Sequence, residues 1–190
     1  ASLFTNRAIS YRQDKGFSHF EAALSVTVQK MVRSDMASSG VMFTLDTETG
    51  FDKVVVINGS WGLGEMVVQG AVIPDEFIVF KPALVQGFKA VIGRDLGKKD
   101  QKIIYGATGT KMVPVAPPEQ NKFCLSDEEV LTLSRSGVKI EEYFSAKHNQ
   151  EQPMDMEWAK DGESNQLFIV QARPETVHTG KDKNLYVEYK

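Results

Sequence analysis

The stretch between Pro153 and Pro174 constrains the fold of this chain more than any other part of the sequence. Residues 154–159 and 167–173 each alternate between apolar and polar side chains, and a polar turn at 161–165 separates them. Alternation with a period of two is typical of a strand that buries one face. The stretch therefore predicts an antiparallel β-hairpin.

The register of this hairpin decides which side chains share a face. A hairpin centred near Ser164 places Glu157 opposite Gln171. The same register places Asp155 opposite Arg173. The other face then carries apolar side chains that can be buried, namely Met154, Met156, Trp158, Phe168, Val170 and Ala172.

This register turns a carboxylate, an amide and a guanidinium towards one cleft. Carboxylate and amide oxygens are hard ligands for Mg2+, and an arginine side chain donates a planar fork to phosphoryl oxygens. The polar face therefore suits a magnesium-bound polyphosphate. A solvated face with an ordinary cross-strand ion pair between Asp155 and Arg173 explains the same pattern, so the hairpin alone leaves both interpretations open.

The composition argues against several classes of partner. The net charge of -3 and the pI near 5.7 give no electrostatic reason to expect nucleic acid. Cys124 is the only cysteine, which excludes an intramolecular disulfide and is typical of a reducing cytoplasm. No apolar run approaches the roughly 20 residues that span a bilayer. We therefore expect a soluble cytoplasmic protein with neither nucleic acid nor a membrane as partner.

Runs of β-branched and aromatic residues predict further strands. They lie at 26–32, 40–46, 53–58, 76–80 and 102–105. We expect the first two runs to pair across a turn at Ser38–Gly40 and the third to end at Gly59, whereas residues 85–97 give no prediction.

One helix is marked by its start. Ser126 can cap the helix, and Glu129, three residues on, completes a capping box. Apolar residues then recur at three- and four-residue steps, at Val130, Leu133, Gly137, Ile140 and Phe144. This stripe predicts a helix that reaches roughly to Ser145 and packs on the apolar face of the hairpin. With a shorter amphipathic helix around residues 8–11, the fold class is α+β, mainly an antiparallel sheet with packed helices.

A glycine-containing loop at 61–65 follows a predicted strand. Gly62 and Gly64 allow close backbone approach to a ligand, so this loop, with Glu65, is a candidate phosphate loop. The loop lacks the third glycine of a dinucleotide fingerprint and the Gly-Lys-Ser/Thr ending of a P-loop. A strand-to-helix turn that binds no ligand is the other interpretation.

Gln29 and Lys30 lie inside the first predicted strand, between Val28 and Met31. An exposed sheet edge explains two polar residues there. A hinge whose backbone from Lys30 to Val32 hydrogen-bonds a purine edge explains them equally well. The pattern alone does not separate these interpretations.

The histidines and serines give no catalytic signature. His19, His148 and His178 are scattered without the spacing of a metal site, so we expect them at the surface. No serine has the Gly-x-Ser-x-Gly setting of a hydrolase nucleophile. Neither residue type therefore competes with the hairpin as the candidate site.

Several motifs taken together resemble those of a known family. Outside the hairpin they are the segments 28–34, 39–43, 61–65, 69–72 and 74–77. Within the hairpin they are Met154-Asp155-Met156-Glu157-Trp158-Ala159 and Val170-Gln171-Ala172-Arg173-Pro174-Glu175-Thr176. In their order and in their amino acids, these segments are similar to the phosphoenolpyruvate synthases, or pyruvate, water dikinases, over nearly the whole chain. The two hairpin motifs are highly specific to nucleotide-binding domains of the pyruvate phosphate dikinase type.

The resemblance implies the C-terminal part of an ATP-grasp domain at residues 1–178, in which ATP lies between two subdomains. Residues 179–190 would form a linker and the start of a following segment. In the family, ATP phosphorylates a histidine on a mobile domain, giving AMP and phosphate, and that histidine then phosphorylates pyruvate in gluconeogenesis. The implied partners are ATP, Mg2+, pyruvate and the phosphohistidine domain. Because those other parts are absent here, this segment alone is not expected to complete a turnover.

The resemblance also assigns roles to individual residues. The adenosine end would be contacted by Gln29 and by the backbone of Lys30, Met31 and Val32. Glu157 and Gln171 would bind magnesium and phosphate, while Arg173 would neutralise the charge developing on the transferred group. Arg173 and Glu157 are thus the expected catalytic residues.

Some features leave alternatives open. Glu151-Gln152-Pro153 stands where the family usually has Gly-Arg-Pro, which removes a positive charge near the site, and the region 106–118 is shortened. Because the nucleotide domain does not report the final phosphoryl acceptor, an antibiotic phosphotransferase of similar three-domain design is one alternative. A non-catalytic relative that binds nucleotide or a protein partner is another.

Overall fold

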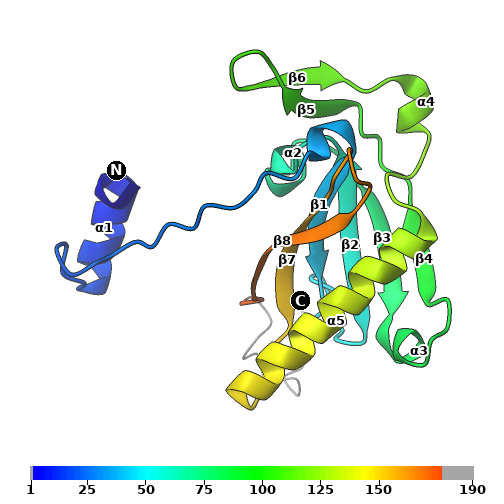
Figure 1. Ribbon diagram of the computed structural model, residues 1–190. Coiled ribbons are helices and arrows are strands. Elements are labelled where there is room, and N and C mark those ends of the chain that lie inside the picture. Colours follow the sequence, from blue (N-terminus) through cyan, green and yellow to red (C-terminus); the bar gives the residue numbers. More distant parts are fainter. Residues whose placement is uncertain (1, 177–190) are drawn as a thin grey trace, which may run out of the picture. The chain divides into compact units, whose positions relative to one another are not determined.

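The computed structural model describes residues 2–176 of the chain (Figure 1). The chain divides into two compact units, Ala1–Met31 and Val32–Lys190. The predicted boundary at residue 178, with the linker 179–190 and His178, lies outside the described residues and stays a prediction.

The first unit contains one 3-10 turn and one helix, η1 (Ser2–Phe4) and α1 (Asn6–Lys15). Thr5 accepts a hydrogen bond from the Ala8 amide and caps α1, so the short helix predicted around residues 8–11 is confirmed. Arg12 is buried, and its guanidinium donates to the carbonyl oxygen of Leu3 at 2.6 Å.

The strand predicted at 26–32 is wrong. The backbone there forms no strand, and the side chains of Val26 and Val28 are 81% and 94% exposed. β-Branched residues favour extended backbone, but a strand also needs a neighbour whose amides and carbonyls pair with its own. No described strand pairs with this run, so the predicted pairing with the run at 40–46 is wrong as well.

The second unit is built on one six-stranded sheet with the order β4-β3-β2-β1-β7-β8, in which every neighbouring pair is antiparallel. Its strands are β1 (Ser38–Phe43), β2 (Val54–Trp61), β3 (Asp75–Phe80), β4 (Val91–Asp95), β7 (Met154–Lys160) and β8 (Leu167–Pro174). A separate hairpin is formed by β5 (Gln101–Tyr105) and β6 (Thr110–Pro114). The α+β class with a mainly antiparallel sheet is therefore confirmed.

The strand predictions at 53–58, 76–80 and 102–105 are confirmed as β2, β3 and β5, although β2 continues past Gly59 to Trp61. The turn predicted at Ser38–Gly40 is wrong, because these residues begin β1. Gly40 lies between β2 and β7, and a Cβ atom there would sit 1.9 Å from the carbonyl oxygen of Asn58. This glycine marks close backbone approach inside a sheet rather than a turn.

Helices and turns connect the strands of the second unit. They are η2 (Ser34–Met36), α2 (Glu65–Val68), α3 (Lys81–Val85), α4 (Pro117–Gln120) and α5 (Asp127–His148). The predicted capping box of α5 is confirmed, because Ser126 accepts from the Glu129 amide and the Glu129 carboxylate accepts from the Ser126 amide at 2.8 Å. Among residues 2–176, no helix is both long and apolar enough to cross a membrane.

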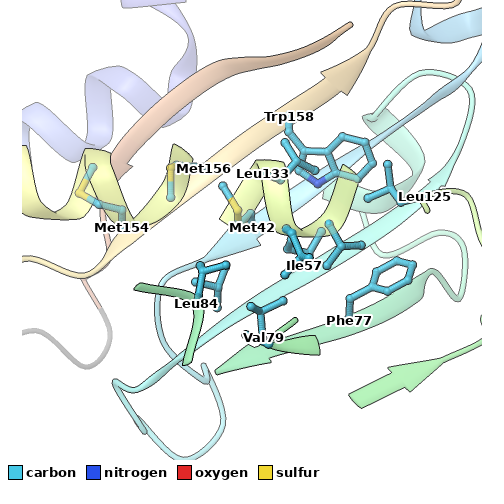
Figure 2. Packing of buried hydrophobic residues seen from close by; sticks show 14 of the residues in the cluster. Met42, Ile57, Phe77, Val79, Leu84, Leu125, Leu133, Met154, Met156 and Trp158 are labelled. Atoms are coloured by element: carbon cyan, nitrogen blue, oxygen red, sulfur yellow. The ribbon is translucent and has the colours of Figure 1, made fainter. Parts of the chain in front are cut away.

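Helix α5 covers one face of the sheet and forms the core with it (Figures 1 and 2). A Cβ atom at Gly137 would lie 3.0 Å from Met42 and 3.2 Å from Met156, so the helix passes directly above these two side chains. The core between helix and sheet includes Met42, Val55, Ile57, Phe77, Val79, Val130, Leu133, Met154, Met156 and Trp158. The predicted packing of this helix on the apolar hairpin face is confirmed, and the polar side chains of the hairpin lie on the opposite face of the sheet.

The β7–β8 hairpin has the predicted register between residues 154–157 and 171–174, but not in the part nearer the turn. A β-bulge falls beside Glu157 and Trp158, where Ile169 instead of Val170 becomes the partner of Trp158. Phe168 therefore faces away from the core and is 40% exposed, whereas Leu167 and Ile169 pack against the core. The prediction that Phe168 shares the buried face is wrong. Ala172 lies opposite Met156 as predicted, but it is exposed on the edge strand β8.

Candidate functional site

A row of polar side chains crosses the sheet face opposite α5. Register places Glu157 of β7 between Gln171 of β8 and Val41 of β1, and Val41 next to Asn58 of β2. Asn58 in turn pairs with Glu76 of β3, and its side-chain amide donates to the Glu76 carboxylate at 3.1 Å. Since direct cross-strand partners share a face, these carboxylates and amides form one row.

A second row lies beside it. Arg173 is the cross-strand partner of Asp155, and Asp155 that of Phe43. The Arg173 Nε donates to Asp155 Oδ2 at 2.7 Å, and Nη2 lies at the same distance from that oxygen. The arginine side chain is 66% exposed and the aspartate side chain 16% exposed, so the aspartate orients a guanidinium that still faces solvent.

Two hollows open on this face. The first, of about 390 Å³, is lined by Phe43, Thr47, Asp155, Arg173, Pro174, Glu175 and Thr176. The second, of about 410 Å³, is lined by Asp46, Thr47, Glu48, Phe51, Val54, Val56, Asn58, Glu76, Ile78 and Ile92. Thr47 borders both hollows, so the loop between β1 and β2 lies at their boundary.

The structure therefore brings together the four predicted polar residues of the hairpin. Both predicted cross-strand pairs are present, Asp155 with Arg173 and Glu157 with Gln171. Asn58 and Glu76 extend the polar row and were missed by the sequence analysis, which treated them only as strand residues. Alternation along each strand could have placed them on a polar face. The strand order that sets this face beside Glu157 could not be read from the pattern.

The candidate phosphate loop at 61–65 has a structural explanation for one glycine. Gly62 has a φ of +84°, and a Cβ atom there would lie 2.6 Å from the carbonyl oxygen of Ile103. Its amide donates to the Ala37 carbonyl at 3.0 Å, and the Leu63 amide donates to the Ile103 carbonyl at 2.9 Å. Both amides are thus used within the protein, and the phosphate role of Gly62, Gly64 and Glu65 stays a prediction.

The residues predicted to contact adenosine fall in both compact units. Gln29, Lys30 and Met31 are exposed residues of the first unit, and Val32 is a half-buried residue of the second. Their approach to Glu157 is not tested by the structure and stays a prediction.

Protein side chains alone do not build a metal centre in the described part of the chain. No group of three or more His, Cys, Asp or Glu residues within residues 2–176 could hold a metal ion. Mg2+ usually combines one or two protein carboxylates with water and substrate phosphate oxygens. The cross-strand pair of Glu157 and Gln171 fits a site in which the protein supplies only a few of the metal ligands.

The described histidines have structural surroundings. His19 accepts a hydrogen bond at Nδ1 from the Arg12 guanidinium at 3.1 Å. His148 ends α5, with its ring 6.1 Å from that of Phe144. Both are exposed, as predicted.

The family model described as the pyruvate phosphate dikinase AMP/ATP-binding domain matches residues 1–189. The chain therefore belongs to this family of nucleotide-binding domains. The sheet with its polar row is accordingly part of an AMP/ATP-binding domain.

Three relatives of known name are phosphoenolpyruvate synthases. The chain is 59% identical over its whole length to the phosphoenolpyruvate synthase of Aquifex aeolicus and 56% identical to that of Synechocystis. It is 52% identical over 94% of its length to the phosphoenolpyruvate synthase of Escherichia coli. The chain spans 22% to 24% of the length of these curated relatives. The predicted resemblance to phosphoenolpyruvate synthases is therefore confirmed for this part of those enzymes.

Proposed function

We propose that the chain is the ATP-binding portion of a phosphoenolpyruvate synthase. In this proposal the parent enzyme moves a phosphoryl group from Mg-ATP to one of its own histidines, outside this chain, and then to pyruvate, in the cytoplasm. The products are phosphoenolpyruvate, AMP and phosphate. The family membership and the names of the relatives support this function. The structural observation that carries it is the carboxylate, amide and guanidinium gathered by β7 and β8 on the sheet face opposite α5.

The fold proposal is that this sheet is one wall of an ATP-grasp cleft. The nucleotide would lie over the face opposite α5, with its phosphates above the β7–β8 hairpin. The purine would meet the backbone of Lys30, Met31 and Val32, with Gln29 beside it. Gly62, Gly64 and Glu65 would border the phosphates as a possible phosphate loop.

The roles of the hairpin residues follow from the chemistry of phosphoryl transfer. This reaction depends mainly on positioning and on stabilising charge, because the transition state carries its charge on the phosphoryl oxygens. Glu157 and Gln171 would supply oxygen ligands to Mg2+, which bridges phosphate oxygens when bound. Arg173 would place its exposed guanidinium against the transferred group, and Asp155 would hold that guanidinium in place through the contact at 2.7 Å.

The substitution Glu157→Gln in the full-length parent enzyme tests this proposal. It removes one negative charge while keeping the size of the side chain, so the metal site exchanges a charged carboxylate ligand for a weaker neutral amide and the fold does not change. We expect ATP-dependent phosphorylation of the enzyme to fall by about a hundredfold or more. The measurement is transfer of the β-phosphoryl label from ATP to the enzyme, and then to pyruvate.

Glu163→Gln is the matched control. Glu163 is an exposed carboxylate on the turn of the same hairpin, with a side chain 64% exposed, and it is not part of the polar row. This variant should keep the activity of the unmodified enzyme. Equal activity of Glu157→Gln and Glu163→Gln would remove Glu157 from the mechanism.

A further inference from the structure

The turn that joins β7 to β8 is organised by the carboxylate of Asp161, the first residue after β7. Its Oδ1 accepts hydrogen bonds from the backbone amides of Glu163 at 3.0 Å and Ser164 at 2.8 Å, and from the Ser164 hydroxyl at 3.1 Å. These donors stabilise the ionised form, and the Ser164 amide, the Arg33 amide, the Glu163 amide and the Ser164 hydroxyl together lower the pKa of Asp161 to about 2. One carboxylate oxygen is therefore sufficient to shape the turn.

The second oxygen of Asp161 reaches a segment far away in the sequence. Its Oδ2 accepts a hydrogen bond from the Arg33 backbone amide at 3.1 Å. The next residue of the turn returns the contact, because the Gly162 amide donates to the Arg33 carbonyl at 3.0 Å. A Cβ atom at Gly162 would lie 2.5 Å from the Cβ of Met36, so the turn lies directly against this segment.

The peptide group held by Asp161 is the one between Val32 and Arg33. Its N–H is the Arg33 donor, and its carbonyl belongs to Val32. That carbonyl accepts from the Ser34 amide at 2.9 Å, and Arg33 has φ −81° and ψ 55°, which is the geometry of an inverse γ-turn. The plane of this peptide group is thus fixed by a hydrogen bond at its N–H and another at its carbonyl.

The Arg33 side chain adds further contacts around the same backbone. Its guanidinium pairs with Asp35 at 2.9 Å and with Glu163 at 3.2 Å, and it lies 5.8 Å from the centre of the Tyr105 ring. Asp35 is largely buried and Glu163 is exposed. The backbone contacts to Asp161 and Gly162 remain when the exposed pair with Glu163 is removed.

We propose that Asp161 is a positioning residue for the purine, an inference that rests on the proposed nucleotide site. Val32 is the last residue of the backbone expected to contact adenosine, and Glu157 lies four residues before Asp161 on β7. At the rise of a β-strand, this spacing corresponds to about 13 Å between the Cα atoms of Glu157 and Asp161. Asp161 therefore sets the distance between the part of the site that reads the purine and the part that holds the phosphates.

A fixed peptide plane also has a consequence for base choice. Backbone groups distinguish adenine from guanine only if their donors and acceptors keep one orientation towards the purine edge. If the Val32–Arg33 peptide could rotate, the site would lose this distinction while retaining its phosphate ligands. Asp161 should therefore influence affinity for the purine and base selectivity, and not the chemical step.

The substitution Asp161→Asn in the full-length parent enzyme tests this inference. An asparagine keeps one oxygen for the turn amides, but it turns an NH2 donor towards the Arg33 amide, so the clamp is lost. We expect the KM for ATP to rise about tenfold and the preference for ATP over GTP to fall about tenfold. The kcat at saturating ATP and the KM for pyruvate should change less than about twofold, whereas a general structural defect would alter both.

AMP binding measured by calorimetry separates this inference from the proposed function, because AMP has a purine but no transferable phosphates. Asp161→Asn should weaken AMP binding about tenfold, while Glu157→Gln should leave it unchanged. If Glu157→Gln kept full phosphoryl transfer, the role proposed for Glu157 would fail, and AMP binding would still decide the role of Asp161.

Glu163→Gln is the control, because it removes the exposed contact with Arg33 and leaves both backbone contacts. Asp161→Ser, which keeps a single acceptor oxygen for the turn, is the second variant if Asp161→Asn does not fold. AMP affinity and base preference equal to those of Glu163→Gln, in whichever variant folds, would overturn the proposal.

Discussion

Two ion pairs of the second unit are chemically similar but differ greatly in their exposure to solvent. Lys99 and Asp75 are completely buried, with side-chain exposures of 0%, whereas Arg173 and Asp155 lie on the open sheet face with exposures of 66% and 16%. Each pair joins one cation to one aspartate. The first is enclosed by its own chain, and the second still presents a charged group to solvent.

The buried pair is satisfied entirely from within the protein. The Lys99 ammonium donates to Asp75 and to the Gly97 carbonyl at 2.8 Å, while Asp75 also accepts from the amides of Gly97 at 2.9 Å and Cys124 at 2.7 Å. Burial, and then the charge of Asp75, raises the pKa of the Cys124 thiol well above its ordinary value. Such a network holds the start of β3 to two distant loops and has no capacity left for a ligand.

The difference separates the structural role of the buried pair from the binding role that we propose for Arg173. A buried charge needs all its partners inside the protein, because a single missing partner leaves an uncompensated charge. An exposed cation oriented by one carboxylate contributes little to stability and can accept a substrate anion. Substitutions in the two pairs should therefore separate stability from activity.

Lys99→Met should have the largest effect on stability. The substitution leaves the Asp75 carboxylate buried without its cation, so we expect the free energy of unfolding to fall by about 3–5 kcal/mol. Urea denaturation measures this change. Lys98→Met is the matched control, because Lys98 is exposed and pairs with Asp100 at 2.8 Å at the surface. Equal stability of the two variants would refute the role assigned to the buried pair.

Glu141→Gln should have an intermediate effect. The Lys81 ammonium lies 2.8 and 2.7 Å from the two carboxylate oxygens of Glu141, and both side chains are mostly buried. Burial raises the pKa of Glu141 and lowers that of Lys81, which means that the pair does not fully offset its loss of hydration. We expect a loss of about 1 kcal/mol in the same urea experiment. A loss as large as that of Lys99→Met would contradict the dependence on burial.

Arg173→Ala should have a small effect on stability and a large one on activity. Because the guanidinium is exposed, we expect unfolding to change by less than about 0.5 kcal/mol. Phosphoryl transfer by the full-length parent should nevertheless fall by about a hundredfold or more. Parallel unfolding and activity measurements on one preparation make this comparison. Marked destabilisation would show that Arg173 acts as a structural residue like Lys99.

The smallest expected effect is a titration at the hairpin turn. The pKa of Asp161 lies near 2 instead of its ordinary value of 3.8, so its stabilising contribution is present above pH 3.8 and is lost as the pH falls through 2. The amide resonances of Arg33 and Ser164 should follow this protonation, with a midpoint near pH 2. An NMR titration measures it, and a midpoint near pH 4 would show that these donors do not hold the carboxylate.

Local patterns predicted much of the hairpin and of α5. Alternation around Glu157 gave both cross-strand pairs of the site, because side-chain direction in a strand follows directly from sequence spacing. The capping box of Ser126 and Glu129 is likewise a local signal, and α5 begins where it predicts. These features depend on residues that are close together in the sequence.

Features that depend on distant partners could not be predicted in this way. The run at 26–32 has strand propensity but no described pairing partner, and Gly40 resembles a turn residue until the neighbouring strands are known. Lys99 resembles a solvated residue of a lysine-rich loop, although it is fully buried. Asn58 and Glu76 join the site only through the strand order. Pairing between distant segments decides each of these outcomes.

The bulge at Val170 gives β8 two halves of opposite parity. Before it, odd-numbered residues such as Ile169 point to the core, and after it odd-numbered residues such as Arg173 point to the face opposite α5. One extra residue thus allows a single edge strand to supply both hydrophobic anchoring and polar ligands. Deleting Val170 would shift the register, so that either Gln171 and Arg173 leave the face opposite α5 or Leu167 and Ile169 leave the core. The length of this strand is therefore as constrained as its composition.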